Sequence, residues 1–275
     1  MPMHLSQADL SGYRARGYHV ARGLFSAPEI ARVLAAAARD KELKRHAFDR
    51  ADGEGGRVRL SLWNHPGDDV YGVLSRTARV VERAEQLVAG EVYHYHSKLI
   101  LKDPEVGGAW AWHQDYGYWY ENGLLAPDLV SMFVALDPAT RDNGCLQVIP
   151  ASHRLGRVDH QLTGEQAGAD PDRVAHIQRR LGVEHVELAA GDALFFHPNL
   201  LHRSDQNRSA KRRWALICCY NHRDNEPVID HHHPGYTKLH KLPDRALLEA
   251  SQQRTGAQAS WLDPDHDHSA RRNKS

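Results

Sequence analysis

The 275-residue sequence has few cysteines, no excess of either charge and no long apolar run. Its three cysteines, Cys145, Cys218 and Cys219, give no disulfide framework of the kind that small secreted domains use. Cys218 and Cys219 are adjacent, so in a strand their side chains face opposite sides of the sheet. We therefore expect a cytoplasmic protein with reduced cysteines.

The charge balance and the lack of apolar runs narrow the range of partners. Lysine plus arginine number 35, and so do aspartate plus glutamate, so the formal net charge is zero and nothing favours nucleic acid. Residues 1–20 lack the apolar segment of a signal peptide, and no stretch approaches the roughly 18 apolar residues of a membrane span. We expect a small-molecule substrate, no nucleic acid and no membrane, with the oligomeric state left open.

The first third of the chain carries helix signals. Two serines are each followed three residues later by an acid, as in a capping box: Ser6 with Asp9, and Ser26 with Glu29. Gly17 ends the first of these helices. Apolar residues at helical spacing predict a third helix over residues 69–89, with Gly90 after it.

The segment between the second and third helices, "DRADGEGGRVRL" from residue 49, has the composition of a turn, so we expect a loop. Residues 49–66 are a candidate lid that would contribute Arg57, Arg59 or Trp63. For any one of these residues, a mobile surface loop is the more ordinary interpretation.

From residue 91 onward the pattern changes to short segments rich in β-branched and aromatic residues, bounded by Gly, Pro, Asn or Asp. They are "EVYHYHSKLILK", "DLVSMFVALD", "CLQVIP", "EHVELAAGDALFFHP" and "RRWALICCYN". We predict a mainly-β fold: a double-stranded β-helix (jelly roll, cupin-like) core with flanking N-terminal and inserted α-helices. The insertion is residues 163–182, where Thr163 with Gln166 predicts one helical turn and Asp170-Pro171 opens another that stops at Gly182.

No linker or repeat divides the chain, so we predict one domain over residues 1–275. Residues 1–90 would be mostly helical support, residues 91–222 the jelly-roll core and residues 223–275 a C-terminal extension. Beyond about residue 250 the sequence is polar, and we expect it to be loosely held.

The stretch "AWAWHQDYGYWYENG", residues 109–123, sets His113 and Asp115 among aromatic rings. Alone, an H-x-D triplet is more often a surface coincidence in a chain with 20 histidines. In a strand, however, residues i and i+2 share a face, so both can reach one metal while Gln114 turns away. A 2-His-1-carboxylate site for iron(II) needs a second histidine from a later strand. His202 is the best candidate, and its rival His197, at the end of the preceding strand, is interpreted as structural.

The chain resembles the phytanoyl-CoA dioxygenase family of Fe(II)- and 2-oxoglutarate-dependent oxygenases. The matching pieces run in family order over residues 91–222: "HQD" at 113–115, "NGCLQVIPASH" at 143–153, "GDALFFHPNLLH" at 191–202, and an arginine at 213. The segment "GYHVARGLFS" at 17–26 resembles the family's N-terminal part.

The resemblance implies that three residues bind iron, namely His113, Asp115 and His202. It also implies that Arg213 pairs with the distal carboxylate of 2-oxoglutarate, which suits a guanidinium that binds carboxylates with two parallel hydrogen bonds. Arg212 is the rival, and because consecutive strand residues point oppositely, only one of the two faces inward. Lys98 and Ser131, on flanking strands, are further candidates for contact with 2-oxoglutarate.

The substrate residues are predicted from the aromatic cluster and the strand before it. Trp119 is the first choice, followed by Tyr116, Tyr118 and His94. His94 and His96 alternate with Tyr93 and Tyr95, and the pattern does not decide which pair faces the interior. If several rings enclose a ligand, they favour a cationic or quaternary-ammonium group.

The expected reaction uses Fe(II), 2-oxoglutarate and O2, and hydroxylates an unactivated C–H of a small polar metabolite with release of succinate and CO2. The substrate class would be amino-acid-like, phosphonate or quaternary ammonium. Asp115 favours hydroxylation over halogenation, because halogenases of related fold have a small residue there. Two alternatives stay open: a non-catalytic metal-binding jelly roll, or a cupin-type metalloenzyme that does not use 2-oxoglutarate and so needs no Arg213. The histidine run 231–233 before Pro234 is interpreted as a solvent-facing cluster rather than a metal site.

Overall fold

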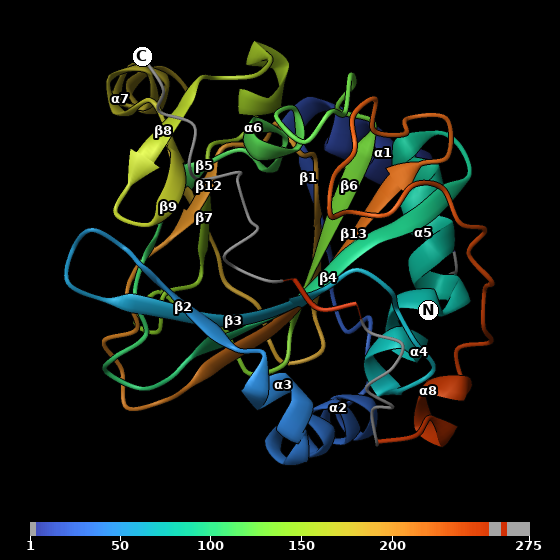
Figure 1. Ribbon diagram of the computed structural model, residues 1–275. Coiled ribbons are helices and arrows are strands. Elements are labelled where there is room, and N and C mark those ends of the chain that lie inside the picture. The colour runs from blue at the N-terminus through green and yellow to red at the C-terminus, as the bar shows by residue number, and fades with distance from the viewer. Residues whose placement is uncertain (1–3, 253–259, 263–275) are drawn as a thin grey trace.

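The fold is a sandwich of two antiparallel sheets, seen in a computed structural model that describes residues 4–252 and 260–262 (Figure 1). The large sheet has the order β1 (Tyr18–Ala21), β11 (Ala193–Phe196), β6 (Leu129–Ala135), β13 (Arg213–His222), β4 (Val92–Lys102), β3 (Arg57–Trp63) and β2 (Phe48–Ala51). The small sheet has the order β10 (Glu184–Val186), β7 (Leu146–Val148), β12 (His202–Ser204) and β5 (Trp110–His113). This arrangement confirms the predicted jelly roll.

Side chains alternate between two cores, one on each face of the large sheet. The inner core lies between the sheets and includes Phe133, Val148 and Leu194. The outer core lies between the large sheet and the helices. Cys218 belongs to the outer core and Cys219 to the inner core, which confirms that these neighbours face opposite sides.

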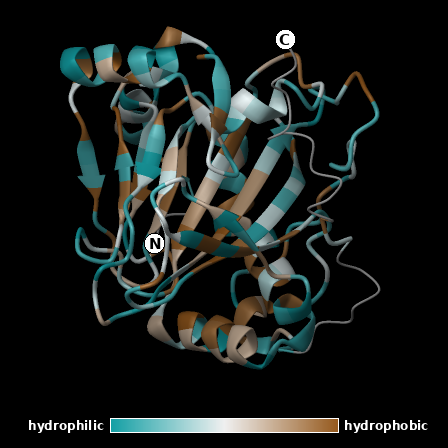
Figure 2. Cartoon of the chain, turned by 60° about the vertical axis from the view of Figure 1, so that its left-hand side comes forward, coloured by the Kyte–Doolittle hydropathy of each residue, from teal (hydrophilic) through white to brown (hydrophobic). Residues whose placement is uncertain are grey.

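Helices cover the outer face of the large sheet. They are α1 (Gln7–Arg16), α2 (Ala27–Arg39), α3 (Lys41–Arg45), α4 (Val70–Arg76), α5 (Ala78–Val88) and α8 (Ala246–Glu249). Near the base of the molecule, α2 has apolar and polar surfaces (Figure 2), and its apolar residues Ile30 and Val33 are buried. Both predicted capping boxes are present, and Gly17 ends α1 with a φ of 84°.

The helix predicted over residues 69–89 is broken into two. Thr77 is extended, with a ψ of 142°, and separates α4 from α5. The backbone of Leu242 pairs on both sides of this break, donating to the Arg76 carbonyl at 2.8 Å and accepting from the Ala78 N–H at 2.8 Å. A segment far along the chain therefore stabilises the interruption, which periodicity within 69–89 does not reveal.

The prediction of a loop at residues 49–60 is wrong, because β2 and β3 form a hairpin that extends the large sheet beside β4. Val58 and Leu60, two residues apart, are buried on one face, and only the turn between the strands has the conformation that the glycines suggested. Arg57 and Arg59 point outward to Glu165 and Asp49. Trp63 is fully buried.

The inserted segment also begins with a β-hairpin, and the helix follows it along the chain. β8 (His160–Thr163) pairs with β9 (Gln166–Ala169), and Thr163 is the cross-strand partner of Gln166 rather than the cap of a helical turn. The second half of the prediction is confirmed, since α7 (Pro171–Leu181) begins after the capping Asp170 and ends before Gly182.

Most of the segment predicted to be loosely held lies outside the described residues. Ser260 and Leu262 are described, and both pair with β3 or the residue after it: the Ser260 carbonyl accepts from the Asn64 N–H at 3.0 Å, and the Leu262 N–H donates to the Leu62 carbonyl at 3.0 Å. Between them Trp261 stacks on His46 at a centroid distance of 4.7 Å. Trp261 and Leu262 are exceptions to the polar composition on which the prediction rested. The division at residues 90 and 222 stays a prediction.

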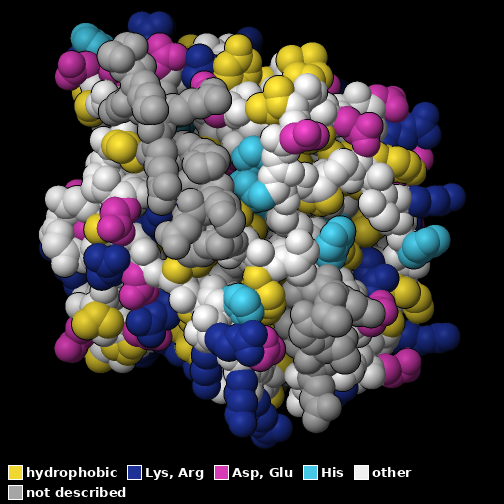
Figure 3. All heavy atoms as spheres, viewed as in Figure 1, with side chains coloured by type: hydrophobic (Ala, Val, Ile, Leu, Met, Phe, Trp, Pro, Cys, Tyr) yellow, Lys and Arg dark blue, Asp and Glu magenta, His cyan; other side chains and the backbone are white. Residues whose placement is uncertain are grey.

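Within residues 4–252 and 260–262, no helix is long and apolar enough to cross a bilayer. On the face shown in Figure 3, acidic and basic side chains are interspersed, with basic ones gathered toward the lower edge, and histidines lie near the middle.

Candidate metal and co-substrate site

His113 and His202 face each other on neighbouring strands of the small sheet. They are cross-strand partners of β5 and β12, with ring centroids 4.0 Å apart. His113 Nδ1 lies 2.8 Å from the Ala111 carbonyl, and His202 Nδ1 lies 2.9 Å from the Leu200 carbonyl. A carbonyl only accepts, so each Nδ1 carries the hydrogen and each Nε2 presents a lone pair, as in a metal-ligating histidine. Burial lowers the pKa of both rings, which keeps them neutral.

Asp115 completes the cluster from a helix rather than from the strand. The chain turns at Gln114, so His113 ends β5 and Asp115 begins α6 (Asp115–Trp119). Asp115 Oδ1 lies 3.8 Å from His113 Nε2 and 3.9 Å from His202 Nε2. Two imidazoles and a carboxylate that converge in this way are the donor set of a 2-His-1-carboxylate iron(II) site.

The two oxygens of Asp115 have different surroundings. Oδ2 accepts a hydrogen bond of 2.6 Å from Ser131, whereas Oδ1 is buried and accepts none. A buried carboxylate oxygen without a partner is costly, and a divalent cation between Oδ1 and the two Nε2 atoms would remove that cost. The residues present therefore fit the metal.

Gln114 and His160 hold the turn between His113 and Asp115. The Gln114 side chain donates to the Gly156 and Asn199 carbonyls, each at 2.8 Å, and so turns away from the cluster, as predicted. Its backbone N–H donates to His160 Nε2 at 2.9 Å. Burial lowers the pKa of His160 to about 4, so this ring is a neutral acceptor. His160 is not predictable from the sequence, since nothing local marks a residue 47 positions after His113.

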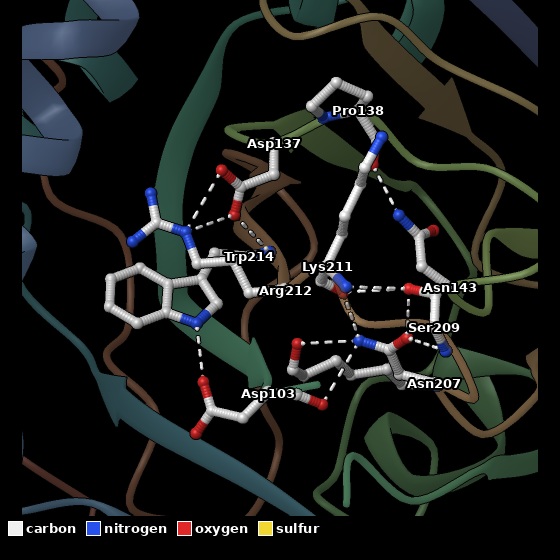
Figure 4. A network of polar contacts seen from close by, with 10 residues as sticks. Asp103, Asp137, Pro138, Asn143, Asn207, Ser209, Lys211, Arg212 and Trp214 are labelled. Atoms are coloured by element: carbon white, nitrogen blue, oxygen red, sulfur yellow. Dashed lines mark hydrogen bonds and ion pairs between the residues drawn. The ribbon is translucent and has the colours of Figure 1, made fainter. Parts of the chain in front are cut away.

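A cavity of about 30 Å³ adjoins the two histidines, and Arg213 lines it. The Arg213 side chain is 1% exposed and its Nε has no partner. Burial lowers its pKa to about 10, which leaves the guanidinium charged at neutral pH. Arg212 instead turns outward to Asp137, with Nε 3.0 Å from Oδ2 (Figure 4). Strand alternation thus places Arg213, and not its rival, inside.

The other two predicted co-substrate residues take different places. Ser131 is buried and does not line the cavity; it donates to Asp115 and so positions the carboxylate. Lys98 lines this cavity and also the neighbouring one. Lys102 and Ser204, for which no sequence signal predicts a place in the site, line the same cavity as Arg213.

The neighbouring cavity, of about 90 Å³, has the aromatic wall expected of a substrate site. Trp119, Tyr118 and Trp110 line it, together with side chains from the β2–β3 and β8–β9 hairpins. Trp119 lies edge-on to Tyr95 and to His96. The β2–β3 hairpin therefore lines this cavity, but it does so through Phe48, Arg50, Leu60 and Leu62 rather than through the expected Arg57, Arg59 and Trp63. That residues 49–66 form a lid stays a prediction.

His94 and Tyr116 do not line the cavity. A β-bulge in β4 leaves Tyr95 without a cross-strand partner, since His96 pairs with Cys219 and His94 pairs with Tyr220. Tyr95 and His96 consequently reach the inner side together, while His94 hydrogen-bonds to Asn64 and Ser97. Tyr116 turns away and donates to the Leu124 carbonyl at 3.1 Å. The strict alternation used in the prediction fails at the bulge.

The prediction of a solvent-facing histidine cluster at residues 231–233 needs correction. His233 is buried and stacks on His96, with centroids 4.8 Å apart and planes at 20°. His232 and His233 line the substrate-side cavity. The three rings lie close enough to hold a metal ion, and they form the second such group among the described residues.

A jelly roll that joins two histidines, an aspartate and a buried arginine has the arrangement of the 2-oxoglutarate-dependent non-haem iron dioxygenases. Comparison with known proteins supports this class. The phytanoyl-CoA dioxygenase (PhyH) family matches residues 13–215. The L-proline trans-4-hydroxylase of Streptomyces griseoviridis is 37% identical over 180 residues, which cover 60% of this chain and 67% of the relative. The ectoine dioxygenase of Halomonas elongata is 30% identical over 240 residues, which cover 82% and 72%.

The crystal structure of EctD from S. alaskensis with bound Fe superposes with a TM-score of 0.72 and 26% identity, covering 87% of this chain and 88% of that one. A nogalamycin carbocyclase, SnoK, shares the fold at a TM-score of 0.68 and 22% identity, covering 84% and 96%. The chain belongs to the phytanoyl-CoA dioxygenase family. Membership confirms the predicted family, the dioxygenase class and the predicted cofactors.

Proposed function

We propose that this dioxygenase hydroxylates a small zwitterionic metabolite, amino- or imino-acid-like, with iron(II) held by His113, Asp115 and His202. The observation that carries the proposal is the buried, unpartnered Asp115 Oδ1 between two Nε2 lone pairs, beside a cavity that holds Arg213. When bound, iron(II), 2-oxoglutarate and O2 supply the oxidising chemistry, with release of succinate and CO2.

The chain's own residues bind, orient and exclude water. Arg213 binds the distal carboxylate of 2-oxoglutarate with two parallel hydrogen bonds. Trp119 and Tyr118 hold the substrate against the metal and keep bulk water out. His96 replaces His94 as a substrate contact. Lys98 lies where the two cavities meet and supplies positive charge to a carboxylate in either.

Size and charge support the substrate class. A cavity of about 90 Å³ accepts a small molecule and leaves no room for the whole of a CoA thioester. The relatives named for L-proline and ectoine act on small cyclic zwitterions. The ring faces of Trp119 and Tyr118 suit the cationic end of such a molecule, and Lys98 suits its carboxylate.

The first test is an anaerobic titration of the iron(II)-loaded protein with 2-oxoglutarate, followed by the visible charge-transfer band. We expect a band in the wild type, its loss in Asp115→Ala, and at least tenfold weaker binding in Arg213→Met. Arg212→Met is the matched control, since that neighbour faces outward, and it should bind normally. A folded, iron-loaded wild type without a band would move the protein to the non-catalytic or cupin-type alternatives.

Substrates are then screened by succinate release with L-proline, other imino acids, ectoine and glycine betaine. We expect turnover above the uncoupled background with at least one zwitterion. Turnover of acyl-CoA thioesters alone would contradict the proposed class. Inhibition by glycine betaine, absent from Trp119→Leu, would support recognition of the cationic end by the rings.

We also propose a cytoplasmic location and a single folding unit over residues 1–275. All three cysteines are free and buried, which suits a reducing compartment. The outer core joins Ala21 to Ala250, which supports one unit. Cell fractionation tests the first proposal. A single cooperative unfolding transition tests the second.

A further inference from the structure

Three consecutive histidines, His231, His232 and His233, bring their rings together beside the substrate-side cavity. The ring centroids of neighbours along the chain are 3.8 and 4.1 Å apart, and those of His231 and His233 are 5.3 Å apart. One ring nitrogen of each residue lies within 4.8 Å of the other two. Consecutive side chains of a strand point in opposite directions, so the bend at residues 232–233 is what lets three neighbours converge.

Asn64 fixes the position of the hydrogen on the His233 ring. Its side-chain N–H donates to the His232 carbonyl at 2.5 Å, so its amide oxygen is the atom that faces the ring, 3.2 Å from His233 Nδ1. An amide oxygen only accepts, so Nδ1 carries the hydrogen and Nε2 presents a lone pair. Backbone carbonyls do the same for the two histidines of the iron site, and metal-ligating histidines commonly have such a partner.

The three rings differ in how firmly they are held. His233 is buried against His96 and Tyr95, with ring centroids at 4.8 and 4.4 Å, so its position is fixed. His231 and His232 are half-buried, so an ion can reach them from solvent and their rings can turn. Metal bonds of about 2.0–2.1 Å place ligand nitrogens about 3.4 Å apart, so the rings need to approach by no more than about 1.4 Å.

The donor set favours one class of ion. All three donors are imidazole nitrogens, whereas the iron site also has the carboxylate of Asp115. Imidazole suits zinc(II), nickel(II) and copper(II), while magnesium and calcium prefer oxygen ligands. Zinc held by three histidines keeps a fourth position for water.

The position of the histidines gives such an ion a consequence. His232 and His233 line the substrate-side cavity, which has a volume of about 90 Å³. One metal-bound water occupies about 30 Å³. An ion on this wall therefore takes a large share of the space that a substrate needs.

We propose that His231, His232 and His233 form a second metal site, which binds one zinc(II), nickel(II) or copper(II) ion and thereby hinders the entry of substrate. This site is separate from the iron-binding residues and takes no part in the proposed hydroxylation. Its inhibitory effect rests on the proposed function of the aromatic-walled cavity, whereas metal binding itself does not.

The test counts the zinc ions that the full-length, metal-depleted protein binds in competition with a chromophoric chelator. The wild type should bind two, one at the iron site and one at the three histidines. His231→Asn and His113→Ala should each bind one, and the double variant none. His240→Asn, the same change at an exposed histidine of the same segment, should still bind two. If His231→Asn does not fold, His232→Asn takes its place.

The count separates this site from the iron site. Two zinc ions in His231→Asn overturn the second site, and so does a wild type whose single zinc ion is lost in His113→Ala. A single zinc ion that is lost in His231→Asn and kept in His113→Ala upholds the second site and contradicts the proposed iron site.

Initial rates of succinate release test the inhibition, with the zwitterion that the substrate screen identifies. Zinc added to the iron(II)-loaded wild type should raise KM by about threefold or more, before zinc exchanges with iron, and should leave the KM of His231→Asn within about 1.5-fold. An equal loss of kcat in both proteins indicates replacement of iron(II) and overturns the inhibitory effect. Absence of turnover with every zwitterion contradicts the proposed function, and the zinc count still decides the second site.

Discussion

At the scale of single residues, the geometry of the proposed metal site depends on groups that contact its three side chains and would not themselves bind the metal. Ser131 donates to Asp115 Oδ2 and so leaves Oδ1 as the oxygen directed at the two histidines. The backbone carbonyls that accept from Nδ1 of His113 and His202 orient the two rings. They fix Nδ1 as the nitrogen that carries the hydrogen, so that Nε2 keeps its lone pair. Partners of this kind orient metal ligands and commonly contribute ten- to a hundredfold to metal affinity.

Ser131→Ala should therefore weaken iron(II) binding by about tenfold or more, because the carboxylate is free to rotate. Competition with a chelator of known affinity measures this. Ser75→Ala removes another buried hydroxyl, one that donates to the Gly72 carbonyl on α4, far along the chain from the ligands. That control should keep wild-type affinity. Equal affinity of both variants would show that Ser131 does not position Asp115.

At the scale of elements, α6 must approach the β8–β9 hairpin closely, and a glycine permits it. A Cβ added to Gly117 would lie 2.2 Å from the His160 ring, far inside contact distance. His160 accepts from the Gln114 N–H, so a displaced ring disturbs the turn between His113 and Asp115. Gly12, in α1, has nothing within 4 Å of an added Cβ.

Gly117→Ala and Gly12→Ala make the same chemical change in two helices with opposite expected results. Gly12→Ala should raise the free energy of unfolding by about 0.5–1 kcal/mol, since alanine favours a helix, and leave iron binding unchanged. Gly117→Ala should lower iron affinity at least tenfold even where the protein stays folded. Denaturant titration and metal competition check both. Normal iron affinity in Gly117→Ala would mean that α6 and His160 can separate without moving Asp115.

Elements whose causes are local could be predicted from the sequence, and elements with distant causes could not. The caps of α1 and α2 rely on residues three positions apart, and the inner strands are marked by their own β-branched and aromatic residues. The break at Thr77 depends on Leu242, and the bulge at Tyr95 depends on the register against β13. In the β2–β3 hairpin, the glycines form only the turn, but their presence led to a loop being predicted where the two flanking strands lie.

The same distinction holds for the site. His113, Asp115, His202 and Arg213 could be found because their spacing is the family's spacing. Lys102 could not, because its burial beside Arg213 comes from strand pairing between residues more than a hundred positions apart. The position of His96 in the site could not be predicted either, because its side chain reaches the inner face of the sheet only through the β-bulge.

At the scale of the whole molecule, the fold buries several histidines as neutral rings. Desolvation lowers the pKa of His94 to about 3, and it lowers the pKa of His96 and His233 well below the usual value. In the unfolded chain the same side chains titrate near pH 6.5. Below that pH the unfolded state therefore binds more protons than the folded state, and stability falls as the pH falls.

The metal-free protein should consequently lose stability between pH 7.5 and pH 5.0. A histidine with a folded pKa of about 3, such as His94, contributes about 2 kcal/mol to that loss. Several such rings together approach the whole free energy of unfolding of an ordinary domain, which is about 5–15 kcal/mol. Urea titrations of chelator-treated protein at the two pH values measure the difference.

Removing one titrating ring should remove its share of the pH dependence. His94→Gln can keep the hydrogen bond that His94 Nδ1 donates to the Asn64 carbonyl, and it should reduce the loss between pH 7.5 and 5.0 by about 2 kcal/mol, whatever its stability at pH 7.5. His185→Gln changes an exposed histidine on β10 and should leave the wild-type loss intact. Only the difference between the two pH values is compared, so a general destabilisation by either substitution cancels. If His94→Gln retained the full wild-type loss, protonation of the His94 ring would not oppose folding, and the acid sensitivity would have to come from the other buried histidines or from the carboxylates.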